Sequence, residues 1–520
     1  MKLTSKHLWF LLGAALLIRL VSLGIMPLMD TTEARYGEQA RIMVETGNWL
    51  TPMFDYDEPF LGKPPMFTWL SAVGIEVFGV SEFAVRFPHW VVGVMTIALG
   101  CFFAKRVGID PLKTAVVMAT IPVFSISSGA VMTDMALTFS LTLAMIGFFF
   151  SWQGERIWGY IGFIGLGLAL LSKGPMAIVL MGLSILPFLA IQHGFVGAFV
   201  QLWKRIPIVG GLVLMCVISF PWYIMAEQAN PGFLEYFIVG EHFNRFLVSG
   251  WEGDRYGNAH DEPRGMIWLF LMLAALPWSV VLPLLAVFRF TRLKEKLSEL
   301  PGVFVFLLFW VLSPLILFTF SGNILATYVL PGMPAFALLV AYLTESKVSY
   351  KVTFFKFLAI TGLVITAVSV YVATELKNDA IIYYVAGAAI LVAGIAFLFK
   401  DKTFNFNWFT FTSYISPIIL IIAICVVMFK TGNERSDKML FVDVDHSKPT
   451  FYVEGGRPFS GQYYSFGQAK RLHNMDQLKG HENGYYIIGP NERIEGFVER
   501  HNLSCTFEVA SPKRSRYLCQ

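Results

Sequence analysis

The sequence predicts an all-α membrane protein that crosses the bilayer many times and ends in a small α/β domain. Of its 520 residues, 56% are hydrophobic and only 15% are charged, whereas a soluble domain is about 25% charged. The apolar residues form blocks of roughly 17–23 residues, the length that a membrane-spanning helix needs. Hydropathy falls sharply after residue 429. We therefore expect a transmembrane domain over residues 1–429 and a separate domain over residues 430–520.

The first apolar block, residues 8–28, follows Lys2 and Lys6 and superficially resembles a signal peptide. It is too long for the apolar region of a typical signal peptide and lacks a clear small-x-small cleavage site. We interpret it as an uncleaved membrane anchor with a cytoplasmic N-terminus.

About thirteen membrane spans are expected on the length criterion. They cover residues 8–28, 88–103, 114–129, 135–152, 157–171, 175–191, 206–226, 266–288, 303–320, 328–342, 354–374, 380–399 and 408–429. The apolar stretch at 67–78 is short and contains Glu76, so we place it along the membrane surface. This placement puts the basic clusters of alternate short loops on the cytoplasmic side, which is the usual orientation. These basic residues are Lys105, Arg106, Lys113, Lys204, Arg205, Arg289, Arg292, Lys294, Lys296, Lys347, Lys351, Lys356, Lys400 and Lys402.

Three regions then face the non-cytoplasmic side of the membrane: a long first loop (29–87), a loop at 227–265, and the C-terminal domain. In the C-terminal domain, the pattern at 450–453 and 485–488 indicates strands.

The same domain has helical character at 468–478. It also contains Cys505 and Cys519, which can form a disulfide if the domain lies outside the cytoplasm.

Polar residues that could catalyse a reaction or bind a ligand lie at the outer ends of the spans or in the outer loops. Charged groups beside the hydrocarbon are costly, so a convergent set of them is a functional-site hypothesis by default. The set consists of Asp30, Glu33, Lys63, Asp134, Lys173, Glu241, His242 and Tyr328.

The acidic residues of this set have two interpretations. Asp30 with Glu33 three residues later resembles a helix capping box, with Asp in place of Ser or Thr. Asp134 likewise stands at the start of a span, where an N-cap is expected. The functional alternative is a carboxylate held just outside the membrane, ready to orient or deprotonate an acceptor.

The two lysines also have alternatives. Lys63 precedes two prolines, which favour the first helical turn, and a helix N-terminus suits a phosphate. Alternatively, Lys63 extends its ammonium from the interface to water. Lys173 ends a span, where the helix dipole favours a lysine in any case.

The segment EHFNRF adds Glu241, His242 and Arg245 as candidate site residues. Together with His260, the first two form a candidate divalent-metal set. Two histidines eighteen positions apart plus one glutamate are a weak metal motif. No cofactor is therefore predicted with certainty, and a divalent metal stays an open alternative.

Two function classes lack their sequence signals. There is no G-x-x-x-x-G-K-[ST] motif and no G-x-G-x-x-G after a strand, which argues against an ATPase and against a Rossmann-type sugar-nucleotide enzyme. The net charge of +4 is too small to indicate a nucleic-acid partner.

Six short motifs together resemble a known family. In chain order they are DTTEARYGEQAR (30–41), GKP (62–64), TD (133–134), SKG (172–174), EHFNRF (241–246) and TYVL (327–330). They resemble the aminoarabinose transferase (ArnT) and protein O-mannosyltransferase-like group of GT-C glycosyltransferases.

The resemblance implies a GT-C bundle of about thirteen helices in the bacterial inner membrane, among membrane lipids, with periplasmic loops and a periplasmic C-terminal domain. It implies transfer of a sugar, with 4-amino-4-deoxy-L-arabinose as a candidate, from undecaprenyl phosphate to lipid A or another lipopolysaccharide acceptor. The alternatives are a protein or other glycan acceptor, and a lipid or sugar transporter. A transporter usually has polar groups near mid-membrane, where this chain has only Arg19.

By resemblance, Glu33 or Asp30 corresponds to the first-loop acid and Asp134 to the second acid, while Lys63 and Tyr328 lie near the carrier phosphate. We expect a single inverting displacement in which positive charge, including Arg264, stabilises the leaving phosphate.

The sequence departs from the family pattern at two places. Gly62 stands where aminoarabinose transferases have a glutamate that is linked to a metal site. Ile324 stands where they have a lysine. These departures leave the metal, the sugar and the acceptor open.

Overall fold

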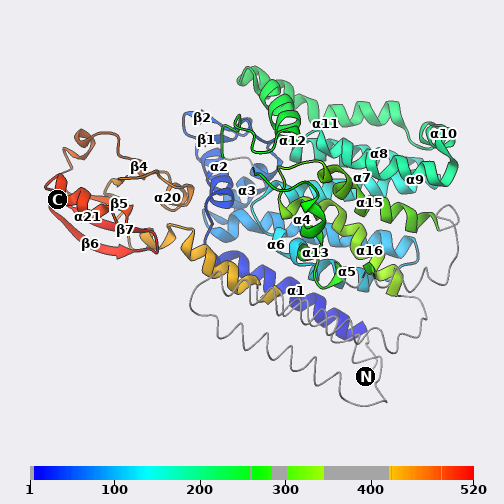
Figure 1. The fold of residues 1–520 in the computed structure, drawn as a ribbon, viewed down its shortest axis with the longest axis horizontal. Helices are drawn as coiled ribbons and strands as arrows, with labels where there is room; N and C mark the ends of the chain where they lie inside the picture. Colours follow the sequence, from blue (N-terminus) through cyan, green and yellow to red (C-terminus); the bar gives the residue numbers. More distant parts are fainter. Residues whose placement is uncertain are drawn as a thin grey trace, which may run out of the picture.

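The computed structural model describes residues 5–257, 260–279, 282–283, 301–344, 421–422, 424–481 and 483–520. A long helical bundle makes up most of the molecule, and a small sheet domain lies at one end of it (Figure 1). The predicted spans 354–374 and 380–399 lie outside the described residues, as do parts of 266–288 and 408–429.

Seven helices within the described ranges are long and apolar enough to cross a membrane, so the multi-pass prediction is confirmed. The seventh joins the 3₁₀ helix η3 (Ala326–Gly332) to α16 (Met333–Thr344). The others are α1 (Ser5–Ile25), α4 (Glu82–Arg106), α7 (Thr133–Trp152), α9 (Met176–His193), α11 (Ile208–Ala229) and α15 (Gly302–Thr319).

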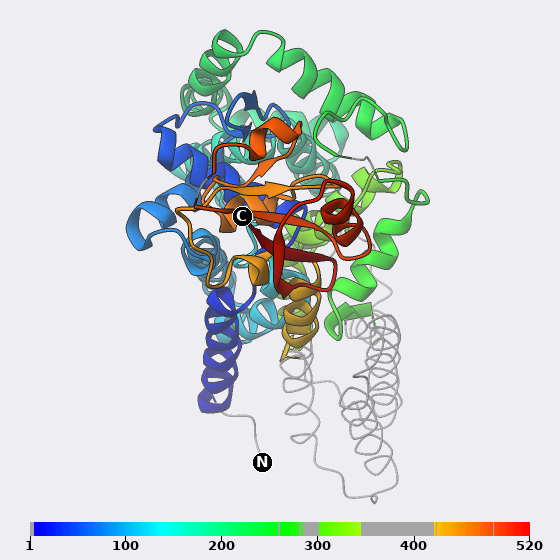
Figure 2. The same ribbon diagram turned by 90° about the vertical axis from the view of Figure 1, so that its left-hand side faces the viewer.

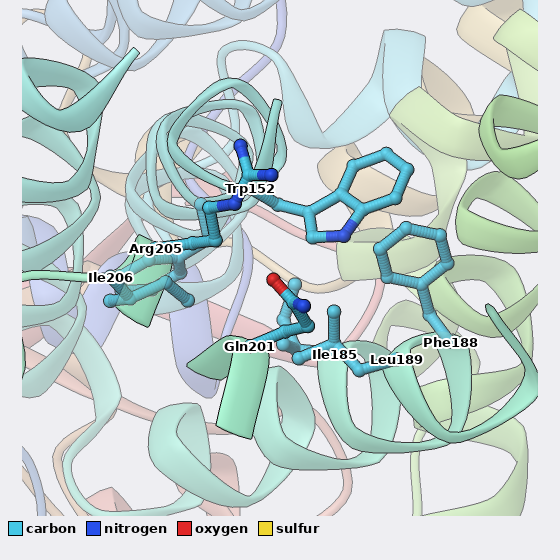
Figure 3. Close-up of a pocket in the computed structure, with 8 residues that line it drawn as sticks. Trp152, Ile185, Phe188, Leu189, Gln201, Arg205 and Ile206 are labelled. Carbon is cyan, nitrogen blue, oxygen red and sulfur yellow. The ribbon is translucent and has the colours of Figure 1, made fainter. Parts of the chain in front are cut away.

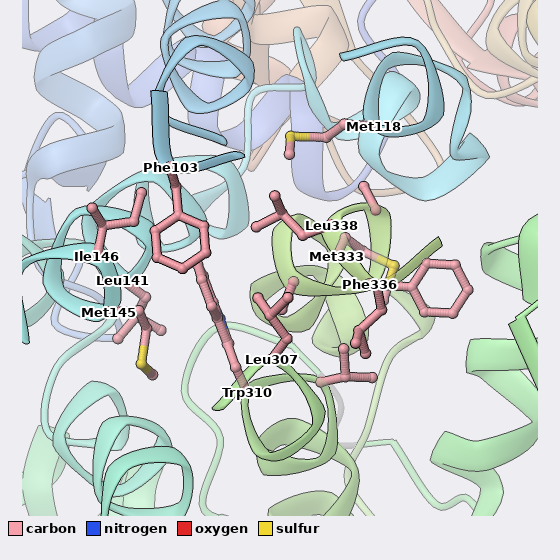
Figure 4. Close-up of a cluster of buried hydrophobic side chains, with 14 of the residues drawn as sticks. Phe103, Met118, Leu141, Met145, Ile146, Leu307, Trp310, Met333, Phe336 and Leu338 are labelled. Atoms are coloured by element: carbon pink, nitrogen blue, oxygen red, sulfur yellow. The ribbon is translucent and has the colours of Figure 1, made fainter. Parts of the chain in front are cut away.

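Large apolar side chains fill the interior of the bundle. Phe103 of α4, Leu141 of α7, Trp310 of α15 and Phe336 of α16 are each almost completely buried and belong to one continuous cluster (Figure 4). The helices are apolar on nearly all sides. Their inward-facing apolar residues form this core, and we expect their outward-facing apolar residues to contact lipid.

Close packing of α7 against α8 (Arg156–Lys173) sets the geometry of the later site. A Cβ atom at Gly147 would lie 2.5 Å from the backbone nitrogen of Gly162. One at Gly165 would lie 2.6 Å from that of Ala144. Only glycine allows so close an approach, and the short turn between the helices makes them antiparallel, so the start of α7 lies beside the end of α8.

The span predicted at 114–129 is wrong as a single helix. The structure has two helices, α5 (Pro111–Thr120) and α6 (Pro122–Ser127). Asp110 caps α5, since its carboxylate accepts hydrogen bonds from Leu112 N and Lys113 N. Pro122 lacks an N–H group and cannot continue the helix.

The end of α6 leaves carbonyl groups without helical partners inside the bundle, and Arg19 binds two carbonyls there. Its guanidinium donates to the carbonyls of Ile126 and Ser128 and to the hydroxyl of Ser22, at 2.8–3.0 Å. The hydrogen-bond donors of this mid-span arginine are therefore paired with backbone carbonyl groups at the end of α6.

The outer regions consist of short elements, and the expected helix at 67–78 is confirmed as α3. The first loop contains α2 (Thr32–Thr46), β1 (Met53–Asp55), β2 (Glu58–Pro59) and α3 (Met66–Phe78). The second contains the π-helix η1 (Glu235–Asn244) and α12 (Arg245–Leu247) before α13 (Met266–Ala274).

The C-terminal domain is a mixed five-stranded sheet of order β4-β3-β5-β7-β6, and it covers one end of the bundle (Figure 2). Its elements are η4 (Lys438–Phe441), β3 (Thr450–Tyr452), α20 (Phe459–Tyr464), β4 (Lys470–Arg471), η5 (Met475–Leu478), β5 (Tyr485–Pro490), α21 (Ile494–Arg500), β6 (Cys505–Ala510) and β7 (Arg514–Cys519).

Both predicted strands of this domain are confirmed as β3 and β5, but the helix predicted at 468–478 is wrong. Lys470 and Arg471 pair with β3 as a short strand. Asn474 then starts a new turn through a capping box with Gln477. On the far strands, Cys505 and Cys519 face each other across the ladder and form a disulfide.

Candidate active site

Two helix ends bring the first charged pair together. Asp134 lies in the first turn of α7, and Lys173 is the last residue of α8. The Lys173 ammonium lies 2.7 Å from the Asp134 carboxylate, and both residues are more than 90% buried. The N-cap interpretation of Asp134 is wrong, because Met132 occupies the N-cap position and the carboxylate faces Lys173.

Tyr328 of η3 closes one side of this pair. The Lys173 ammonium lies 4.1 Å from the centre of the Tyr328 ring, in a cation–π arrangement. The ring packs on Phe318 of α15, with 4.7 Å between the ring centres. Three sequence-predicted residues therefore share one position at the end of the bundle.

A second group forms around the buried carboxylate of Glu241 on η1. It accepts hydrogen bonds from Lys63 at 2.6 Å and from Arg245 at 3.0 Å. Arg245 also pairs with Asp254 at 3.2 Å, and the Tyr236 hydroxyl donates to Glu241. Burial alone would raise the pKa of Glu241, but the two cations lower it to about 2.

His242 connects the two groups. One of its ring nitrogens lies 3.1 Å from the carbonyl oxygen of Lys173, and the other lies 2.8 Å from that of Phe237. Burial lowers the pKa of His242, against the opposing effect of the two carbonyls. The hydrogen bond to Lys173 places the segment that carries Glu241 directly beside the Asp134–Lys173 pair.

The residues proposed for a metal do not fit one. Glu241 is already bound by Lys63 and Arg245, and both nitrogens of His242 face carbonyl oxygens. His260 is exposed on a separate stretch, where its amide donates to Asn323. Across the described parts of the chain, no three His, Cys, Asp or Glu side chains gather to hold a metal ion.

Glu33 lies beside the candidate site but is held by an arginine. Both of its carboxylate oxygens accept hydrogen bonds from Arg86, at 2.8 and 2.6 Å. One of them also receives the amide of Val131, three residues before Asp134. Burial opposes ionisation of Glu33, but Arg86 lowers its pKa below the usual value.

Asp30 is directed away from the site, which corrects both interpretations of it. Thr31 is the N-cap of α2 and makes no side-chain capping bond. The Asp30 carboxylate instead accepts the amide of Ser460 at 3.0 Å and also the hydroxyl of Ser460, on α20 of the C-terminal domain. Burial raises the pKa of Asp30 to about 6, against the effect of these hydrogen bonds.

Arg264, predicted to bind phosphate, is an exposed residue in the loop before α13. Three residues of the site were not predicted from the sequence. Arg86 binds Glu33, Tyr236 binds Glu241, and Asp254 binds Arg245. Arg86 was missed because α4 begins at Glu82, six residues before the predicted start of the span. A charged residue flanking an apolar block was a usable signal.

The site therefore combines three cations, Lys63, Lys173 and Arg245, with two buried carboxylates, Asp134 and Glu241. Lys63 and Arg245 remain about one-fifth exposed through their side chains. An incoming anion can compete with Glu241 for both of these cations, because ammonium and guanidinium groups donate to phosphate oxygens as they do to carboxylate oxygens. This arrangement suits recognition of a phosphate and, beside it, positioning of a nucleophile.

Several known proteins are similar to this chain in sequence or fold. Residues 10–237 match the family model "Dolichyl-phosphate-mannose-protein mannosyltransferase". The chain is 29% identical, over 64% of its length, to an undecaprenyl phosphate-alpha-4-amino-4-deoxy-L-arabinose arabinosyl transferase of Yersinia pestis (strain Pestoides F). It is 28% identical over the same share to a second such transferase, of Pseudomonas fluorescens (strain Pf0-1). The matches span 59% and 58% of those relatives.

The crystal structure of ArnT from Cupriavidus metallidurans bound to undecaprenyl phosphate superposes with a TM-score of 0.78 at 18% identity. The match covers 99% of this chain and 98% of that one. The predicted fold class is thereby confirmed across both the bundle and the C-terminal domain.

Proposed function

We propose that this chain, which is ArnT-like in its motifs and has the GT-C fold, is a polyprenyl-phosphate-sugar-dependent glycosyltransferase. Its donor is a sugar carried on undecaprenyl phosphate, with 4-amino-4-deoxy-L-arabinose as the first candidate. Its acceptor is lipid A or another lipopolysaccharide component. The names of the relatives and the ligand of the crystallised one support the donor.

One observation carries this proposal: Lys63 and Arg245 both bind the Glu241 carboxylate, which lies beside the Asp134–Lys173 pair. A polyprenyl phosphate is an anion with several acceptor oxygens, and two cations in a sheltered site bind such a group strongly. Glu241 holds both cations in place and occupies the position that the donor phosphate takes over.

In the reaction, the acceptor oxygen attacks the anomeric carbon of the sugar, and the bond between that carbon and the phosphate oxygen breaks. The bonding electrons leave with undecaprenyl phosphate. Lys63, Arg245 and the hydroxyl of Tyr328 stabilise the leaving phosphate. A phosphate acceptor is already ionised, whereas a hydroxyl acceptor passes its proton to Asp134, whose carboxylate Lys173 orients.

Two features support the periplasmic side of the membrane for this site. The candidate site lies toward the end of the bundle at which the C-terminal domain docks (Figure 1), since that domain binds Asp30, three residues before Glu33. That domain contains the Cys505–Cys519 disulfide, and structural disulfides persist outside the reducing cytoplasm. Both support a periplasmic site on the bacterial inner membrane.

The test of this proposal is Lys63→Ala in cells that depend on the gene, with Arg264→Ala as the matched control. We expect Lys63→Ala to lose at least about 100-fold in transfer, because removal of one donor to a developing anion costs that much. Membrane insertion should stay normal. Arg264→Ala should retain activity, since its side chain is exposed in a loop.

The readout is the mass spectrum of lipid A together with polymyxin survival. Full activity of Lys63→Ala would remove this residue from the mechanism. A sugar mass added to a protein or another glycan, with lipid A unchanged, would replace the acceptor and keep the donor.

A further inference from the structure

The end of the bundle opposite the candidate site carries a short helix, α10 (Phe195–Arg205), between α9 and α11. The helix α7 begins at the candidate site with Asp134 and ends here with Trp152. Its 20 residues place the two regions about 30 Å apart. Whatever binds at α10 is therefore separate from the sugar-transfer site.

The outward face of α10 is apolar. Phe195, Val196, Phe199 and Trp203 are 76%, 75%, 52% and 66% exposed, and their spacing places them along one side of the helix. The opposite side packs on α9 through the buried Ala198. A helix with one free apolar face at the end of membrane spans lies in the membrane interface, with that face among the acyl chains.

A polar hollow lies directly beside this face. It has a volume of about 530 Å³ and lies between the ends of α7 and α9 and the end of α10. Its lining consists of Trp152, Gln153, Glu155, His193, Gln201 and Arg205. Figure 3 shows Trp152, Gln201 and Arg205 around the adjoining space.

The lining offers hydrogen-bond donors and one positive charge, that of Arg205. Glu155 is ion-paired with Arg106, so its charge is compensated. The Trp152 indole donates to Nε2 of His193 at 2.8 Å, which leaves Nδ1 of that ring as a donor. Arg205 and its neighbour Lys204 are exposed, and Gln201 lies one turn before Arg205 on the same side of α10.

We propose that this hollow binds the phosphate headgroup of an anionic membrane phospholipid, whose acyl chains lie along the apolar face of α10. The volume falls in the range of small-molecule sites, and its charge is complementary to a phosphodiester. Basic pockets beside membrane helices bind anionic headgroups in this way. The contiguous apolar face gives the lipid tails a surface that a free anion would not use.

The test measures lipid retention by the purified full-length protein in detergent, using native mass spectrometry. The probes are phosphatidylglycerol, the zwitterionic phosphatidylethanolamine, and inorganic phosphate as a competitor. We expect phosphatidylglycerol to bind about tenfold more tightly than phosphatidylethanolamine. Arg205→Gln should lose about tenfold in this affinity, because it removes one charge-assisted contact.

The matched control is Arg156→Gln, which removes an exposed arginine from the same end of the bundle but outside the lining. We expect it to bind phosphatidylglycerol like the wild type. An equal loss in both variants would reduce the effect to general surface charge and overturn the proposal. Displacement of phosphatidylglycerol by inorganic phosphate at equal concentration would overturn it in favour of a free-anion site.

A second variant keeps the test decisive if Arg205→Gln does not fold. Gln201→Leu keeps every charge but removes a polar group of the lining. It should weaken phosphatidylglycerol binding severalfold and leave transferase activity unchanged. Unchanged lipid retention in both lining variants would contradict the proposed site.

Discussion

The Asp134–Lys173 pair has the clearest energetic consequence among the individual residues. Both side chains are buried, and they form an ion pair with 2.7 Å between the Lys173 ammonium and the Asp134 carboxylate. A buried charge without its partner is strongly unfavourable, whereas removal of both charges together is often tolerated. The pair therefore contributes to stability as a unit, in addition to the role in transfer that we propose for it.

We predict that Asp134→Leu alone lowers the free energy of unfolding by about 3–5 kcal/mol, because Lys173 is left as an isolated buried cation. The double variant Asp134→Leu, Lys173→Met should recover most of this loss. Thermal unfolding of the detergent-solubilised protein measures both. Equal stability of the single and double variants would show that the lysine reaches water when unpaired.

Asp30 gives the molecule a pH-dependent contact. Its pKa is about 6 in the folded protein against an ordinary value of 3.8. An acid whose pKa is raised on folding contributes stability that is fully present below the ordinary pKa, and this contribution disappears as the pH rises through the folded value. The window therefore runs from about pH 4 to pH 6.

Asp30→Asn removes this titration, since asparagine resembles the protonated acid. We predict that the variant has a higher unfolding temperature than the wild type at pH 7.5 and that the difference shrinks at pH 5. Thermal melts at the two pH values test this. A difference that grows as the pH falls would show that Ser460 stabilises the charged form more than burial destabilises it.

At the scale of elements, the packing of α7 on α8 determines where the site can form. The two helices approach closely only because Gly147 and Gly165 have no side chain at the contact. This approach places the start of α7 beside the end of α8, and hence Asp134 beside Lys173. The apolar blocks at 135–152 and 157–171 predict both helices, but the contact between them depends on three-dimensional distances that sequence spacing does not reveal.

Gly147→Ala should therefore destabilise the protein by about 1–3 kcal/mol, the usual cost of an overpacked contact, and should reduce transfer. Gly182→Ala in α9 is the matched control, because no heavy atom lies within 4 Å of its new Cβ. It should be neutral or slightly stabilising, since alanine favours helix. Unfolding temperature and transfer rate are the measurements. Equal effects of the two substitutions would contradict the role given to the α7–α8 contact.

At the scale of the whole molecule, the C-terminal domain docks on the segment that leads into the first loop. The Tyr464 hydroxyl accepts the amide of Leu28 at 2.8 Å, and Arg457 pairs with Asp55. Arg86 binds the carbonyls of Met26 and Pro27 from the bundle side. The turn before Glu33 is therefore held from both sides, which explains why Asp30 faces the domain instead of the site.

Hydropathy and charge were sufficient to predict the class of the molecule, most of the described spans and the end at which the polar groups gather. Predictions from local sequence patterns were wrong where a residue distant in sequence determines the contact that a side chain makes. The capping box at Asp30 looked plausible, but Ser460, 430 positions away, binds its carboxylate. Within the span predicted at 114–129, the missing N–H of Pro122 breaks the helix, although the apolar block is long enough to cross the membrane.

The central claim is that a polyprenyl phosphate replaces the Glu241 carboxylate as the ion-pair partner of Lys63 and Arg245. Affinity for undecaprenyl phosphate, measured on purified Lys63→Ala and Glu241→Gln, tests it most directly. We predict that Lys63→Ala binds at least about tenfold more weakly, because it loses a charge-assisted contact. Glu241→Gln should bind at least as tightly as the wild type, because the competing carboxylate is gone. Equal loss of binding in both variants would contradict the claim.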